Sequence, residues 1–126
     1  MGKSIWVVTT RCTDPSREEE FNRWYDEVHL PDLLKVPGLV AAQRYRFHGH
    51  TPMFPPPEGA PEPTYVAIYE FESDGPPPDP QAIIAMLQTA VPDIADRTID
   101  YIEVVSATMF TALGERQVAR SVPAGV

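Results

Sequence analysis

Two hydrophobic periodicities alternate along the chain and predict its secondary structure. Runs of β-branched and aromatic residues are typical of strands, and apolar residues spaced three or four positions apart are typical of amphipathic helices. The elements follow one another in the order strand, helix, strand, strand, helix, strand. We expect strands at residues 4–10, 39–48, 64–71 and 101–111, and helices at residues 16–29 and 80–90.

The first helix carries a start signal and a disturbance near its end. Asp14 or Ser16 can cap its first turn. Pro31 lacks an N–H and clashes with the preceding turn, so the helix should be disturbed after His29, with one further turn at 32–34. The expected apolar stripe, which packs on a sheet, consists of Phe21, Trp24 and Val28.

This order of elements predicts an α+β domain with the ferredoxin-like βαββαβ topology. Both helices should cover one face of a four-stranded antiparallel sheet. The other face then needs a cover, which a second copy can supply by packing sheet to sheet. We assign residues 1–115 to this domain and residues 116–126 to a C-terminal tail.

Composition and charge narrow the classes of function. The 126 residues carry a net charge of −8, which disfavours binding to nucleic acid and to anionic membranes. No apolar stretch is long enough to cross a bilayer, the first ten residues lack a leader's apolar segment, and Cys12 is the only cysteine. These features favour a cytoplasmic protein. A chain of this size buries a small core, so a pocket is easier to build between two subunits.

The most informative polar residues follow one another on the first helix. Asn22, Tyr25 and His29 are spaced at i, i+3 and i+7 and should share a stripe beside the apolar one. The end of a helix and nearby carboxylates would favour the protonated, charged form of His29, whereas burial would favour its neutral form. We therefore expect a pKa near neutrality and a role as general acid or base. Asp32 either caps the short turn or orients His29.

Other polar residues allow a structural or a functional interpretation. Arg44, Arg46 and His48 share a strand face and either bind a carboxylate or enolate oxygen or form a solvated edge. His48 and His50 have a metal-like spacing, but no further ligand is placed to join them, so we expect a loop entrance and no metal. The proline-rich connection 49–63 should form the mouth of the pocket through its apolar residues Met53 and Phe54.

The helix segment from Phe21 to Asp32, with its His-x-Pro-Asp sequence, the following Pro37-Gly38 and the Arg44-Tyr45 strand resemble the dimeric α/β-barrel superfamily, in particular its EthD-like branch. The strand at 65–71 is also similar. The resemblance implies a homodimer with a small-molecule pocket. It leaves the reaction open, because such barrels host cyclases, isomerases, dehalogenases and cofactor-free monooxygenases.

Three functions remain in view. The first is a cofactor-independent lyase, isomerase or cyclase acting on a small apolar carbonyl, aromatic or polyketide-like compound, with His29 as the acid or base. The second is a cofactor-free monooxygenase, and the third is a binding or accessory protein. Tyr25 and Asp32 are the expected catalytic partners of His29. Residues expected to bind substrate or line the pocket are Trp6, Asn22, Arg44, Met53, Phe54, Tyr65, Tyr69, Met109 and Phe110.

Overall fold

The computed structural model describes residues 2–60, 62 and 64–120. Four strands form one sheet in the order β2-β3-β1-β4, and each neighbouring pair is antiparallel. This confirms the expected ferredoxin-like topology. The strands are β1 (Gly2–Cys12), β2 (Leu39–Arg46), β3 (Tyr65–Ser73) and β4 (Ile102–Thr111).

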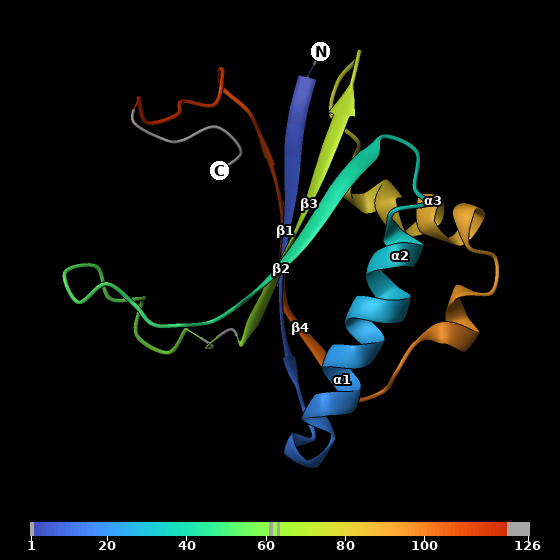
Figure 1. Cartoon of the computed structure of the whole chain (residues 1–126), viewed down its shortest axis with the longest axis vertical. Coiled ribbons are helices and arrows are strands. Elements are labelled where there is room, and N and C mark those ends of the chain that lie inside the picture. The colour runs from blue at the N-terminus through green and yellow to red at the C-terminus, as the bar shows by residue number, and fades with distance from the viewer. Residues whose placement is uncertain (1, 61, 63, 121–126) are drawn as a thin grey trace.

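All helical segments lie on one face of the sheet, as the sequence predicts (Figure 1). The first helix is continuous from residue 15 to residue 33, but its hydrogen-bonding pattern changes along its length. Its successive segments are η1 (Pro15–Arg17), α1 (Glu18–Trp24), η2 (Tyr25–His29) and α2 (Leu30–Leu33). The second helical region, on the same face, consists of η3 (Pro80–Ala82), α3 (Ile83–Ala90) and η4 (Ile94–Arg97).

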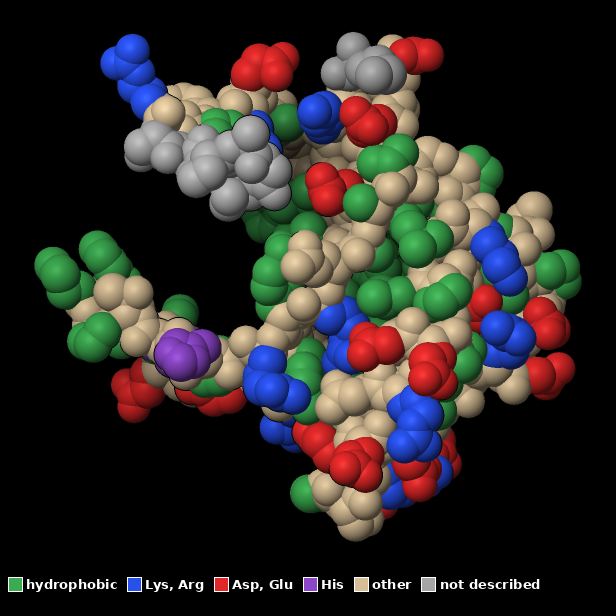
Figure 2. Space-filling view, in the orientation of Figure 1, with side chains coloured by type: hydrophobic (Ala, Val, Ile, Leu, Met, Phe, Trp, Pro, Cys, Tyr) green, Lys and Arg blue, Asp and Glu red, His purple; other side chains and the backbone are tan. Residues whose placement is uncertain are grey.

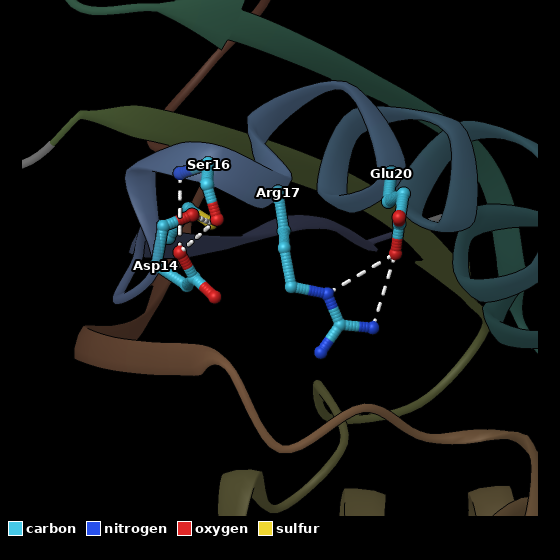
Figure 3. Close-up of polar contacts among 5 residues, drawn as sticks. Asp14, Ser16, Arg17 and Glu20 are labelled. Carbon is cyan, nitrogen blue, oxygen red and sulfur yellow. Dashed lines mark hydrogen bonds and ion pairs between the residues drawn. The ribbon is translucent and has the colours of Figure 1, made fainter.

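Short-range polar contacts fix the start of the first helix (Figure 3). The Asp14 carboxylate accepts hydrogen bonds from the Ser16 N–H at 3.1 Å and from the Ser16 hydroxyl at 2.6 Å. One turn later, the guanidinium of Arg17 donates to the carboxylate of Glu20 at 3.0 Å. Of the two caps that the sequence allows, the structure uses Asp14, which satisfies a backbone N–H that a helix start leaves without a partner.

The disturbance expected at Pro31 takes the form of a π-helical turn. The Leu30 N–H bonds to the carbonyl of Tyr25, five residues back. In a regular α-helix, the Pro31 ring would clash with the carbonyl of Glu27. The wider turn removes this conflict, and the helix continues to Leu33. The expectation that the helix ends at His29 is therefore wrong, and His29 is not at a helix terminus.

The core lies between the sheet and the helices. On β3 every second residue is buried, and Phe21 and Tyr25 cover these positions from the first helix with 0% and 1% of their surface exposed. Tyr25 thus belongs to the apolar stripe, whereas Trp24 is only partly buried. A register shift after Leu39 moves the later residues of β2 by one position, so Leu39 does not share a face with Tyr45 as expected.

The opposite face of the sheet, which we call the open face, is not covered by any helix in the described residues (Figure 1). Two segments stand out on that side: a loop arm, residues 47–60, and a C-terminal arm, residues 112–120. Hydrophobic side chains are visible along the sheet between them (Figure 2). Phe54 and Phe110 are 73% and 53% exposed, and Leu113 is fully exposed.

None of the helices among the described residues combines the length and the apolar character that crossing a bilayer requires. Residues 121–126, which end the expected tail, lie outside the described part of the chain.

Candidate functional site

A cavity of about 390 Å³ lies between the helices and the sheet of a single chain. We call it the His29 cavity. Its size falls within the range of small-molecule sites, roughly 300–1,000 Å³. The expectation that a pocket would form between subunits is wrong for this cavity, because the walls come from both layers of one chain. They include Trp6, Val8 and Thr10 of β1, Tyr69 of β3, Ala107 of β4, and Trp24, Tyr25, His29 and Leu33 of the first helix.

The π turn places the ring of His29 against two aromatic rings. It stacks on Trp24 with ring centroids 4.8 Å apart and meets Tyr25 edge-on at 5.0 Å. Trp24 and His29 are five residues apart, which in a regular α-helix separates side chains by about 140° around the axis. The wider turn brings them into line. The Trp24 indole is itself held by a 2.7 Å hydrogen bond from Nε1 to the carbonyl of Arg97.

Burial controls the charge of His29. Removal from water disfavours the imidazolium and lowers the pKa of His29 to about 4, outweighing the opposite effect of the Asp32 carboxylate. Arg44 acts in the same direction as burial. The expected pKa near neutrality is therefore wrong. The ring is neutral at physiological pH, so one nitrogen is free to accept a proton while the other donates.

The hydroxyl-bearing residues Tyr25, Tyr69 and Thr10 also line the His29 cavity. Burial raises the pKa of Tyr25 above its usual value, and the pKa of Tyr69 well above it. The two phenols influence each other, and the Thr10 hydroxyl also acts on Tyr25. Within the described residues, the buried Thr10 Oγ1 has no hydrogen-bond partner. Since buried polar groups are normally paired, the Thr10 hydroxyl has capacity left for a ligand.

The carboxylate of Asp32 forms ion pairs with two basic side chains. This carboxylate, 1% exposed, accepts two hydrogen bonds from Arg97, at 2.7 and 3.1 Å, and one from Lys35 at 3.5 Å. These bonds lower its pKa. No hydrogen bond joins Asp32 to His29 in the described residues. The effect of Asp32 on His29 is thus electrostatic, and its expected part in catalysis stays a prediction.

A second polar site lies on the other side of Tyr25. Arg44 donates to the Asn22 amide oxygen at 2.8 Å and to the Asp26 carboxylate at 2.9 Å. The Asn22 amide donates to Tyr65 Oη at 3.2 Å. We call these residues the Arg44 site. It borders a separate open hollow, so Asn22, Arg44 and Tyr65 do not line the His29 cavity as expected.

The remaining expected residues are spread over both faces. Trp6 and Tyr69 line the His29 cavity with ring centroids 5.5 Å apart. Met109 packs against the core, and Phe110 is on the open face. Met53 and Phe54 lie on the loop arm, where they are 81% and 73% exposed, and they do not line the His29 cavity. The loop arm stands on the opposite side of the sheet (Figure 1), so it is not the mouth of this cavity within one chain.

The histidines outside the first helix form no metal site in the described part of the chain. No group of three or more His, Cys, Asp or Glu side chains there could hold a metal ion. His50 instead contacts the carboxylate of Glu62 at 3.1 Å and the ring of Phe47 at 5.0 Å.

The wall residues that sequence reasoning missed include Thr10, Trp24, Ile84 and Leu87. Trp24 and Leu87 read as ordinary core residues of amphipathic helices. A polar residue at an inward position of an otherwise apolar strand was the available signal for Thr10. Nothing in the helix 80–90 distinguishes cavity residues from core residues.

Comparison with known proteins supports the fold. No family model matches the chain, and no curated protein matches its sequence. The solved structure of HapK from Hahella chejuensis superposes with a TM-score of 0.61 at 18% identity, over 92% of this chain and 98% of that one. This likeness confirms the expected α+β ferredoxin-like fold.

Two EthD proteins are also similar in structure. An EthD family protein from Bacillus halodurans C-125 has a TM-score of 0.48 at 15% identity, with 93% of this chain and 100% of that chain covered. An EthD-like protein from Ralstonia eutropha JMP134 has a TM-score of 0.48 at 14% identity, over 92% and 96% of the two chains.

Proposed function

We propose that this protein is a cofactor-independent enzyme that moves a proton next to a carbonyl group of a small apolar molecule. The observation that carries the proposal is the neutral imidazole of His29, which faces a largely apolar cavity together with the hydroxyls of Tyr25, Tyr69 and Thr10. A lyase, an isomerase and a cyclase would all need this proton transfer.

In this reaction, His29 acts as the general base. Its neutral ring accepts a proton from the carbon beside the substrate carbonyl. The C–H electron pair forms the C=C bond of an enolate, and the π pair of the carbonyl moves onto the oxygen. The imidazolium then returns the proton to another carbon or to the oxygen. A buried imidazolium is costly, which favours rapid return of the proton. Stacking on Trp24 at 4.8 Å keeps the ring in place.

The hydroxyl groups stabilise the charge that forms on the oxygen. Phenols with raised pKa values stay protonated, so Tyr25 and Tyr69 can donate hydrogen bonds to an enolate at neutral pH. Donors aimed at developing charge in a water-poor site often supply the largest part of catalysis. Thr10, whose hydroxyl lacks a partner in the described residues, can add a third donor.

The lining also defines the class of substrate. Among the described residues that line the His29 cavity there is no Lys, Arg, Asp or Glu, and a charged substrate group would lose its hydration without a partner there. The aromatic rings of Trp6 and Trp24 come from the sheet and the helix, respectively. An uncharged, flat compound such as an aromatic or polyketide-like ketone fits these walls.

Exchange of α-protons for deuterium tests the proposal without knowledge of the natural substrate. We expect 2-tetralone, an uncharged bicyclic ketone, to exchange faster with the protein than without it, as followed by proton NMR in D₂O. His29→Ala and His29→Gln should lower the rate about 10²–10⁴-fold, the usual loss for a general base. His50→Gln, on the loop arm, is the matched control.

The same assay separates the alternatives. Exchange that persists at the wild-type rate in both His29 variants would contradict the role of His29. Binding of 2-tetralone without exchange would favour an accessory or binding protein. Consumption of dissolved oxygen with an electron-rich phenol, measured with an electrode, would favour a cofactor-free monooxygenase.

We also propose that a second copy covers the open face. Both arms stand on this side of the sheet (Figure 1), and Phe110 of the edge strand β4 is 53% exposed on the same face. A sheet with one apolar face uncovered is normally packed against another layer. Light scattering should give twice the mass of one chain, and Ile68→Lys on the open face should give a folded monomer. A wild-type monomer that stays folded on dilution would contradict the dimer.

A further inference from the structure

The guanidinium of Arg44 lies among three aromatic rings. Its central carbon is 4.2 Å from the ring centroid of Tyr25, 5.0 Å from that of Tyr65 and 5.8 Å from that of Phe21. All three distances are within the usual range of a cation–π interaction, about 6 Å. Tyr25 is the closest of the three. The contact joins β2 to the centre of the first helix.

The charge of Arg44 is only partly neutralised by its neighbours. Its side chain is 11% exposed, whereas that of its single carboxylate partner, Asp26, is 60% exposed. Water therefore screens Asp26 more than Arg44. Asn22 offers a neutral oxygen, and the buried Nε of Arg44 has no hydrogen-bond partner within the described residues. A net positive field thus acts on the ring of Tyr25.

Tyr25 separates this charge from the His29 cavity. Tyr25 lines that cavity and Arg44 does not. The other groups that act on Tyr25 are Tyr69 of β3, Thr10 of β1 and His29 of its own helix, and all three are neutral at physiological pH. Arg44 is the cation that acts on Tyr25 from behind, and its effect on the pKa of Tyr25 opposes that of burial.

We propose that Arg44 is a positioning residue that acts through Tyr25: its cation behind the phenol ring makes the Tyr25 hydroxyl a stronger hydrogen-bond donor to negative charge in the His29 cavity. This inference rests on the proposed function for its catalytic meaning. A positive charge near a phenol favours phenolate character, so charge on the hydroxyl oxygen costs less. Arg44 does not line the His29 cavity, so in this proposal it acts through Tyr25 and not as a direct ligand of the enolate oxygen.

Site-specific incorporation of 3,5-difluorotyrosine at position 25 allows a direct test. Fluorine lowers the pKa of the phenol into an accessible range and provides a ¹⁹F NMR signal. Arg44→Met, which keeps bulk but removes charge, should lower the ionisation constant of this residue about tenfold. Arg46→Met is the matched control, because Arg46 lies two positions along β2, is exposed, and is outside the ring contacts described above.

A second variant separates charge from structure. Asp26→Asn removes the partly compensating carboxylate and leaves the exposed surface otherwise unchanged, so it should raise the same ionisation constant. Loosening of the helix would move both variants in the same direction, whereas an electrostatic effect moves them in opposite directions. Asp26→Asn also keeps the test decisive if Arg44→Met fails to fold.

The outcomes are distinct from those of the His29 test, because the titration needs no substrate and no turnover. An unchanged ionisation constant in Arg44→Met, or the same direction of change in both variants, would overturn the inference and leave the role of His29 intact. If 2-tetralone exchanges, Arg44→Met should lower kcat with little change in KM, the pattern of a lost transition-state interaction. A rise in KM with unchanged kcat would also overturn it.

Discussion

The two faces of the sheet differ in how deeply they bury their residues and in how they should respond to substitution. On the helix-covered face, Tyr69 and Phe71 are 1% and 2% exposed, and the same packing that builds the core also shapes the His29 cavity. On the open face, side chains such as Phe110 remain 53% exposed. A substitution on the covered face should change folding and chemistry together, whereas one on the open face should change the stability of a single chain only slightly and leave the chemistry unchanged.

The largest expected effect comes from removing a core ring. Phe21→Ala should lower the free energy of unfolding by about 3–5 kcal/mol, because it leaves a cavity beneath Tyr25 and Tyr65. Phe110→Ala on the open face is the matched control and should cost less than about 1 kcal/mol. Urea denaturation at low protein concentration measures both. Equal losses would remove the contrast between the faces.

Acidification should reveal the buried imidazole. The pKa of His29 falls from 6.5 to about 4 on folding, so between these pH values the unfolded chain binds more protons and stability falls as the pH falls. The shift corresponds to roughly 3 kcal/mol. Between pH 7 and pH 4, His29→Gln should therefore lose roughly 3 kcal/mol less stability than the wild type. Denaturation series at several pH values, with His48→Gln on the loop arm as control, would show this. Parallel wild-type and His29→Gln curves would contradict it.

The next effect is a gain in stability. Thr10→Val removes a buried hydroxyl without a partner in the described residues and should raise the free energy of unfolding by about 1 kcal/mol. The same change should lower the 2-tetralone exchange rate, because a donor is lost from the His29 cavity. A thermal melt and the exchange assay, run on one sample, compare the two effects. A loss of stability would mean that the hydroxyl is satisfied in the folded chain.

The smallest effect is expected one residue earlier on β1. Thr9 is on the open face, where its hydroxyl and that of Ser106 on β4 are 2.6 Å apart. Thr9→Val should cost about 0.5 kcal/mol, the usual size of a cross-strand pair, and should leave 2-tetralone exchange unchanged. Chemical denaturation measures this loss of stability, which is opposite in sign to the gain expected for Thr10→Val. An effect on exchange would show that the open face reaches the cavity.

The fold was accessible from sequence because its signals are local. The nearly continuous apolar run at 64–71 and the helix stripe at 80–90 each predict an element, and the order of the elements predicts the topology. The site was accessible only in part. His29, Tyr25, Trp6 and Tyr69 do meet in one cavity, but Asn22 and Tyr65 gather around Arg44 instead.

The errors have two physical causes, breaks in regular periodicity and the depth of burial. Regular periodicity assumes a constant 3.6 residues per turn, and the π turn at Tyr25–His29 breaks that assumption halfway along the helix. The register shift after Leu39 does the same for the alternation on β2. The pKa of His29 depends on the depth of burial, which spacing along a sequence does not give.

The π turn also has a consequence for the comparison of sequences. A turn closed by a bond across five residues instead of four contains one residue more than a regular helical turn. A related chain with a regular helix would be one residue shorter here, and its strands would still superpose. Aligning the two without a gap between Tyr25 and Pro31 would pair His29 with a residue on another side of the helix. The equivalent of the cavity histidine in a distant relative must therefore be located by superposing the sheets, and its absence from an ungapped alignment says nothing about the chemistry.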